Sequence, residues 1–205
     1  MKRKLLVLYI LILNSLLPGQ DFIFFSDSPN NNYYDPSWGF ANAPSTLLLA
    51  GTGIKFPVST QYYYSGINSL ILNWNSQTGG DWGIAVAETG WPGHNINLKD
   101  SISFWVYSLT GLDSSLLPQI YLEDLGNQKT DRFSLSDYSA SIPADVWTKI
   151  MVPLSVFKNN PGSADVTKIK TIFFGQDLMD GSTHTLYIDE IRMTTSSNDV
   201  TPPSI

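Results

Sequence analysis

The residues of this sequence best suited to chemistry are aromatic rings that alternate with aliphatic side chains. In one apolar segment this alternation places Trp105 and Tyr107 on the same face, and in the next segment it groups Tyr121 with Glu123. If the aliphatic sides form a core, these four side chains lie together on the outer face of one sheet. Aromatic rings beside hydrogen-bonding groups bind sugars, because a pyranose has an apolar face and a rim of hydroxyls. The alternative is that loops cover the rings and form a second, minor core.

Trp91 and Gln176 extend this hypothesis, whereas Trp38 and Trp82 have other expected roles. Trp91 lies in the turn-like stretch Thr-Gly-Trp-Pro-Gly, where a large ring with a polar N–H can serve recognition. Gln176 is a candidate hydrogen-bond partner for sugar hydroxyls. Trp38 is either another recognition ring or a plug at one end of the fold. Trp82 shares strand parity with its aliphatic neighbours and is therefore expected at the rim of the core.

Carboxylates are the residues that would make this protein a glycosidase. Such an enzyme needs two of them flanking one bond, roughly 5 to 10 Å apart. The adjacent pairs Glu123-Asp124 and Asp189-Glu190 point to opposite faces of a strand, so neither pair can straddle a glycosidic bond. A catalytic pair assembled from separate strands stays open. No nucleophile elbow, His-Glu-x-x-His helix or phosphate-binding loop occurs in the sequence.

Two other carboxylates suggest a metal site. Asp27 follows the first expected strand and Asp189 lies in the last one, and such strands commonly lie side by side in a sandwich. The two side chains would then meet near a turn that contains Gly66 and Asn68. Carboxylates with turn carbonyls suit Ca²⁺, a hard ion that prefers oxygen ligands. The alternative is an Asp that caps a turn through its own backbone.

The rest of the chain must supply the elements that position these residues. Short runs of β-branched and aromatic residues alternate with clusters of Gly, Pro, Asn, Asp and Ser, which is typical of an all-β domain. We expect strands at Phe22–Ser26, Ile54–Tyr64, Ser69–Trp74, Trp82–Glu88, Ile102–Ser108, Gln119–Asp124, Asp131–Leu135, Val146–Val152, Thr171–Gly175 and Thr185–Met193. Brief helical turns are expected at Pro153–Lys158 and Ala164–Ile169. This pattern predicts a single antiparallel β-sandwich or jelly roll, because each strand has one face to bury.

The two ends of the chain differ from this middle part. Residues 1–20 carry basic residues, an apolar stretch and then Pro-Gly-Gln, the pattern of a cleavable secretory signal peptide. The apolar stretch is shorter than the roughly 20 residues of a membrane-spanning helix. We therefore expect a secreted protein, extracellular or at the cell surface, without a membrane span after cleavage. The sandwich would occupy residues 21–194, and the polar, proline-containing residues 195–205 would form a linker or tail to possible downstream domains.

Composition excludes several classes of protein. The formal net charge is −6, and cleavage of the basic leader would make it more negative. Nucleic acid is therefore not an expected partner, because binding to phosphate backbones requires a clustered basic surface. The sequence contains no cysteine, which rules out disulfide bonds and thiolate metal sites.

A series of short motifs follows in order along nearly the whole chain. They are Phe24-Phe25-Ser26-Asp27, Asp35-Pro36-Ser37-Trp38, Gly66-Ile67-Asn68-Ser69-Leu70, Asp81-Trp82-Gly83, Ile102-Ser103-Phe104-Trp105, Val146-Trp147-Thr148-Lys149-Ile150, Val152-Pro153-Leu154 and Tyr187-Ile188-Asp189-Glu190-Ile191. This ordered set resembles the carbohydrate-binding modules of the galactose-binding-like jelly-roll superfamily, especially the family 11 group and its relatives on secreted bacterial enzymes.

The resemblance implies an antiparallel jelly roll whose concave sheet cradles a glycan chain. It also implies a structural calcium ion near the first and last strands, which favours Asp27 and Asp189 as ligands. Ligand-binding residues do not carry over, because the cleft residues vary between members of this superfamily.

Three functions follow from these observations. The leading hypothesis is a secreted, non-catalytic module that binds a polysaccharide or oligosaccharide, ancillary to a glycan-degrading enzyme. The second is a structural or adhesive surface domain without a sugar site, which would differ in leaving no aromatic groove exposed. The third is a glycosidase or polysaccharide lyase on the same jelly roll.

Overall fold

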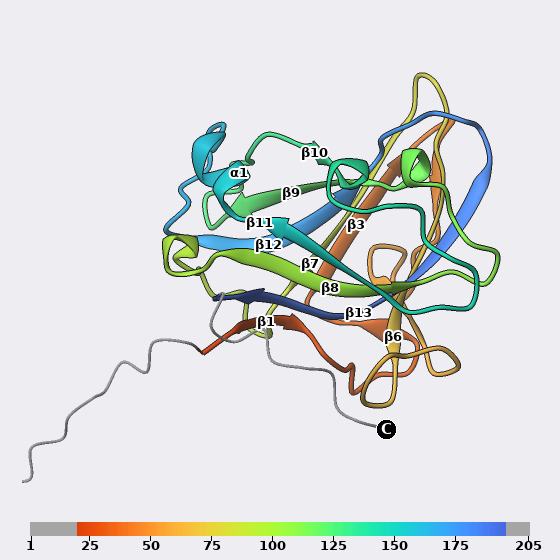
Figure 1. Cartoon of the computed structure of the whole chain (residues 1–205), viewed down its shortest axis with the longest axis horizontal. Coiled ribbons are helices and arrows are strands. Elements are labelled where there is room, and N and C mark those ends of the chain that lie inside the picture. The colour runs from red at the N-terminus through yellow and green to blue at the C-terminus, as the bar shows by residue number, and fades with distance from the viewer. Residues whose placement is uncertain (1–19, 196–205) are drawn as a thin grey trace, which may run out of the picture.

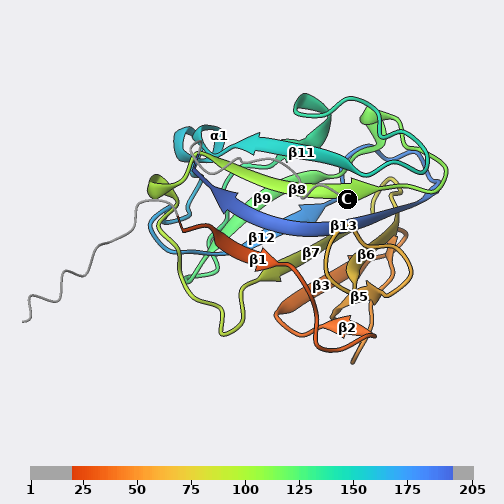
Figure 2. The same cartoon turned by 60° about the horizontal axis from the view of Figure 1, so that its bottom comes forward.

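The computed structural model describes residues 20–195 as two antiparallel sheets packed face to face (Figures 1 and 2). The larger sheet has the order β11 (Thr148–Pro153), β8 (Ser101–Tyr107), β13 (Thr183–Thr194), β6 (Ser69–Asn75), β5 (Phe56–Ser59) and β2 (Tyr33–Tyr34), with β1 (Phe22–Phe25) also paired to β13 and β4 (Thr46–Leu47) to β6. The smaller sheet has the order β10 (Phe133–Ser134), β9 (Gln119–Asp124), β12 (Ile169–Gly175), β7 (Asp81–Ala87) and β3 (Ser37–Asn42). The short helices are η1 (Ile96–Leu98), η2 (Ser114–Leu116), η3 (Leu135–Asp137) and α1 (Ser155–Asn159). The predicted all-β sandwich is confirmed.

The core lies between the two sheets and is built from the aliphatic side of each alternating strand. Phe104 of β8 and Phe174 of β12 meet edge to face across the interface, with ring centroids 5.5 Å apart. Both rings are fully buried, and burial of such a side chain stabilises the fold by about 1.5–3 kcal/mol. Trp82 is also fully buried, and its indole N–H donates to Ser76 Oγ at 2.9 Å. The predicted core position of Trp82 is therefore right.

Most of the predicted strands form, with small shifts at their ends. The strand expected at Ile54–Tyr64 is wrong beyond Ser59, because the chain turns away there. Strand β3 was not predicted, since the Asp-Pro pair and Gly39 resemble a turn, yet it pairs along its whole length with β7. Residues 164–169 form no helix, only a turn closed by the N–H of Lys168 and the carbonyl of Asp165, whereas α1 overlaps the other predicted turn and extends one residue beyond it.

The terminal predictions fall largely outside the part of the chain that the structure describes. Residues 1–19 and 196–205 are not among the described residues, so the expected signal peptide and linker stay predictions. Within residues 20–195, no helix has the length and apolar character needed to cross a membrane.

Candidate functional site

The structure places the four side chains of the predicted sugar-binding face on two different sheets. Trp105 and Tyr107 belong to β8 in the larger sheet, whereas Tyr121 and Glu123 belong to β9 in the smaller sheet. The prediction that these four side chains share one outer face is therefore wrong. The physical reason is that the chain crosses from one sheet to the other between β8 and β9, so the same alternation points outward on opposite sides of the sandwich.

The outer face of the larger sheet carries a cluster of half-buried rings. Tyr64 stacks on Trp105 with ring centroids 4.0 Å apart and an interplanar angle of 12°. Tyr62 stacks on Tyr107 at 5.4 Å and 20°. Both tyrosines come from the loop after β5, which folds over this face. One face of Trp105 and of Tyr107 is thus occupied by the protein itself, as the covered-ring alternative requires.

The outer face of the smaller sheet carries a row of side chains that crosses four strands. Trp38 of β3 pairs with Ala85 of β7, Ala85 pairs with Phe173 of β12, and Phe173 pairs with Tyr121 of β9. Residues paired in this way point to the same side of a sheet. Trp38 is 43% exposed, whereas Tyr121 and Phe173 are buried. The row therefore begins at an open aromatic ring and continues into covered ones.

A second row beside the first contains two glycines. Phe40 pairs with Gly83, Gly83 with Gly175, and Gly175 with Gln119. A Cβ at Gly83 would lie 2.8 Å from Phe40 Cε1 and 2.9 Å from the hydroxyl oxygen of Tyr121. The absence of a side chain at Gly83 therefore leaves the space that Phe40 and Tyr121 occupy.

Charged groups surround the open end of the aromatic row. Glu123 Oε1 lies 3.1 Å from Lys170 Nζ, and Glu123 Oε2 lies 3.8 Å from Lys129 Nζ. Lys170 reaches this face because the register of β12 against β9 shifts between Ile169 and Thr171. A pocket of about 470 Å³ is lined by Ser37, Trp38, Lys55, Ala85, Trp91, Glu123, Asn127, Lys129, Lys170 and Phe173. It thus combines two indole rings with hydrogen-bonding groups of both charges.

Two cations lie over the covered rings of the same sheet. The guanidinium carbon of Arg132 is 4.6 Å from the ring centroid of Tyr121, and Lys129 Nζ is 5.0 Å from that of Phe173. Arg132 also pairs with Asp81, with 3.7 Å between Nη1 and Oδ1. Burial raises the pKa of the Tyr121 hydroxyl to about 12. That hydroxyl has no hydrogen-bond partner within the described residues.

The remaining predicted ligand residues fall in different places. Trp91 has a φ of 55° and lines the pocket beside Trp38, as its position in a turn suggested. Gln176 is buried, and its amide accepts from Ser45 Oγ at 2.6 Å and donates to the carbonyl of Gly80 at 2.9 Å. The amide of Gln176 therefore holds two loops together. Lys129, Lys170 and Arg132 could not be recognised from local sequence, because only strand pairing brings them to the rings.

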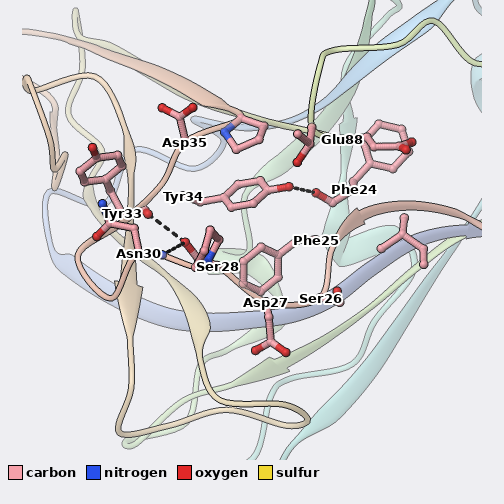
Figure 3. A pocket seen from close by; sticks show the side chains of 14 residues that line it. Phe24, Phe25, Ser26, Asp27, Ser28, Asn30, Tyr33, Tyr34, Asp35 and Glu88 are labelled. Carbon is pink, nitrogen blue, oxygen red and sulfur yellow. Dashed lines mark hydrogen bonds between the residues drawn. The ribbon is translucent and has the colours of Figure 1, made fainter.

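A second pocket of about 470 Å³ lies beside β1 (Figure 3). Its central hydroxyl, that of Tyr34, is 2.8 Å from the carbonyl of Phe24 and 2.9 Å from that of Ala87. In Figure 3 the Asp27 carboxylate points away from Tyr34 and Glu88. The acidic groups of this pocket therefore do not converge on one ligand position, and the smaller sheet is the better candidate site.

The four predicted metal-site residues do meet at one turn. Strand β1 pairs with β13 as expected, and Asp27 Oδ1 accepts from the backbone N–H groups of Ile67 and Asn68 at 2.8 and 3.2 Å. A Cβ at Gly66 would lie 2.1 Å from Asp27 Oδ2, so this close approach requires glycine. The Asn68 side chain is engaged elsewhere, by the backbone N–H and carbonyl of Ser28.

Asp189 completes this turn from the other side. Its Oδ2 accepts from the backbone N–H groups of Tyr64 and Ser65, and its Oδ1 accepts from that of Glu190. The side chain is fully buried, and burial raises the pKa of its carboxyl to about 7. The three N–H groups favour the charged form of the carboxyl but do not offset its burial, and carboxylate oxygens of this kind are ligands that a hard cation prefers. The described residues contain no cluster of three acidic or histidine side chains at a metal-binding spacing.

A comparison with protein families assigns the chain to one of them. The family described as carbohydrate binding domain 30 matches residues 21–195. The chain belongs to this family. It is thus a carbohydrate-binding module, as the predicted resemblance to such modules implied, and its family is 30.

The relatives of the module agree with this assignment. An exo β-1,2-glucooligosaccharide sophorohydrolase of Parabacteroides distasonis is 26% identical over 191 residues, which cover 92% of the module and 24% of that protein. A family 30 module of a cellulosomal cellulase of Clostridium thermocellum has the same fold at a TM-score of 0.69, with 20% identity over 87% of this chain and 99% of that one. A family 11 module of the same organism, in complex with a β-1,3-1,4-mixed-linked tetrasaccharide, gives a TM-score of 0.55, with 14% identity over 86% of this chain and 96% of that one. The module therefore spans about a quarter of its curated relative.

Proposed function

We propose that the module binds a β-linked glucan along the outer face of the smaller sheet. The observation that carries this proposal is the half-open Trp38, set in one pocket with Trp91, Glu123 and Lys129. The names of the relatives support a β-glucan as the ligand, because they refer to a β-1,2-glucooligosaccharide, a β-1,3-1,4-mixed-linked tetrasaccharide and a cellulase.

The residues of the site have separate roles in this proposal. Trp38 and Trp91 stack on the apolar faces of glucose rings, and Phe40 extends this surface along the second row. Glu123 and Lys129 hydrogen-bond to hydroxyls, since a carboxylate accepts and an ammonium donates. Each charge already has a partner of opposite sign, which suits a neutral glycan better than a charged one.

The test compares two tryptophans on opposite sides of the sandwich. The full chain, Trp38→Ala and Trp105→Ala are run through gels that contain β-1,2-glucan or mixed-linked β-1,3-1,4-glucan, and are sedimented with insoluble cellulose. We expect the wild type and Trp105→Ala to be retained, and Trp38→Ala to lose retention on the same glucan. Retention by Trp38→Ala with loss in Trp105→Ala would instead place the sugar on the larger sheet. Retention of no protein on any glucan would favour the structural or adhesive alternative.

A structural metal site is independent of the sugar site. We propose that Asp27 and Asp189 hold a structural Ca²⁺ ion with oxygens of the turn that contains Gly66. When bound, the ion supplies positive charge that neutralises the buried carboxylate, and it ties β1 to β13.

We also propose that the module works as part of a larger protein. It acts as a secreted, non-catalytic part of a glycan-degrading protein, and it raises the local concentration of polysaccharide by tethering alone. Its role is then to bind and not to hydrolyse. If it were a hydrolase on this face, Glu123→Gln would abolish glucan turnover, and assays of reducing sugar released by the purified chain decide this.

A further inference from the structure

The centre of the smaller sheet contains a ring that is positioned for a ligand but covered. Tyr121 lies in the same cross-strand row as Trp38 and Phe173, yet no part of it is exposed. Its ring is parallel to that of Phe173, with centroids 4.8 Å apart and an interplanar angle of 7°. The row of sugar-stacking rings is therefore interrupted by side chains that lie above Tyr121.

The nearest charged group over the Tyr121 ring is Arg132, which pairs with Asp81, and Lys129 Nζ lies farther away, at 5.7 Å from the ring centroid. Arg132 directly precedes β10 at one edge of the sheet, and Asp81 begins β7, with β9 and β12 between those strands. The guanidinium lies over the Tyr121 ring and is 3.7 Å from the Asp81 carboxylate. The two side chains are 37% and 38% exposed. Ion pairs that exposed to water contribute little stability, so this one can separate at small cost.

Two buried hydroxyls on the outer side of the smaller sheet lack partners. Tyr121 and Thr171 both point to the outer side of the sheet, and both hydroxyls are buried without a hydrogen bond among the described residues. A buried hydroxyl without a partner costs free energy that any ligand hydroxyl reaching it would recover. The glycines at 83 and 175 leave the space that the Tyr121 ring occupies over the neighbouring strands.

We propose that Arg132 and Asp81 form a displaceable cover over a further sugar subsite at Tyr121, which opens to a neutral glucose residue when the ion pair separates. This inference rests on the proposed glucan site and extends it across the sheet. In the open state the glucose ring stacks on Tyr121, and its hydroxyls bond to the Tyr121 hydroxyl and to the separated guanidinium and carboxylate. The cover thus lowers the affinity for glucan and makes it depend on salt, although the ligand carries no charge.

The first experiment detects the cover without any glycan. The full-length wild type and Arg132→Ala are treated with tetranitromethane, and nitration of each tyrosine is read by peptide mass spectrometry. We expect Tyr121 to be protected in the wild type and nitrated in Arg132→Ala. Tyr34, which is buried and bonded to two carbonyls, must stay protected in both proteins if the variant is folded. Protection of Tyr121 in a folded Arg132→Ala protein overturns the proposal.

The second experiment measures the consequence for binding. Titration calorimetry with soluble β-1,2-glucan and mixed-linked β-1,3-1,4-glucan compares the wild type, Arg132→Ala, Asp81→Asn and Lys168→Ala. We expect Arg132→Ala to bind the preferred glucan about threefold to tenfold more tightly, since it no longer displaces an ion pair and a cation–π contact. Asp81→Asn should change the affinity in the same direction. Lys168→Ala removes a cation from an exposed pair with Asp165 and should bind as the wild type does.

The dependence of glucan affinity on salt tests the ion pair directly. The wild type should bind more tightly in about 1 M NaCl, which screens the ion pair, and Arg132→Ala should not respond. Wild-type binding that is strengthened neither by salt nor by Arg132→Ala overturns the covered subsite and leaves the glucan site in place. Binding of neither glucan by either protein overturns both proposals.

Discussion

Tyr121 and Phe173 stack in parallel on neighbouring strands, with ring centroids 4.8 Å apart, although both face the outside of the sandwich. Rings on an outer face are usually open to water, but here side chains from the edge of the sheet cover them. This stack joins the half-open Trp38 to the charged edge of the sheet. Its stability therefore bears directly on the shape of the candidate site.

The hydroxyl of Tyr121 offers a direct test of this packing. We expect Tyr121→Phe to raise the free energy of unfolding by about 1 kcal/mol, because it removes a buried hydroxyl that has no hydrogen bond. Urea unfolding followed by fluorescence measures the change. The matched control is Tyr34→Phe, which removes a hydroxyl bonded to two carbonyls and should destabilise the protein by about 1–2 kcal/mol. Equal losses in the two variants would show that the Tyr121 hydroxyl does have a partner.

Alanine at either glycine of the second row should destabilise the protein. Gly83→Ala places a Cβ within 3 Å of both Phe40 and Tyr121 and should lower the free energy of unfolding by about 1–3 kcal/mol. Gly175→Ala meets only Tyr121 Cε1 this closely, at 3.0 Å, and should cost less. Denaturant midpoints of the two variants test this order. A fully stable Gly83→Ala protein would mean that Phe40 and Tyr121 do not lie this close to Gly83.

Removal of metal tests the proposed calcium site. If Ca²⁺ binds only the folded module, a chelator should lower the melting temperature by about 5–10 °C. Asp189→Asn should melt at the same temperature with and without chelator, whereas Asp165→Asn, at an exposed carboxylate elsewhere, should keep the shift. Differential scanning calorimetry gives these values. An unchanged wild-type melting temperature in chelator would exclude a tightly held structural ion.

The raised pKa of Asp189 predicts a pH dependence in the absence of metal. Its carboxyl has a pKa of about 7 in the folded protein and about 4 when unfolded, so the folded state binds the extra proton between these values. The contribution of Asp189 to stability is therefore present below about pH 4 and is lost as the pH rises through about 7. We expect the stability of the wild type relative to Asp189→Asn, measured in chelator by urea unfolding, to fall over this range. A difference that is constant with pH would contradict the raised pKa.

Much of the fold follows from local alternation alone. The period of two in β7, β8 and β9 separates inward aliphatic side chains from outward rings, and it correctly placed Trp82 in the core. The neighbouring positions of the first and last strands were also predictable, and they bring Asp27 and Asp189 to the same turn. These features depend on side-chain direction along one strand and on a common property of sandwiches, so a single sequence is enough to infer them.

Only the tertiary structure decided which rings share a surface. The alternation of side chains along each strand indicates that Trp105 and Tyr121 both point outward. It does not show that their strands belong to different sheets, because sheet membership depends on pairing between residues far apart in the chain. Strand β3 brings Trp38 beside Phe173, and the edge next to β10 brings Arg132 over Tyr121. The sequence by itself therefore determined the sandwich, its core and its likeness to carbohydrate-binding modules, whereas long-range strand pairing determined which side chains share the candidate site.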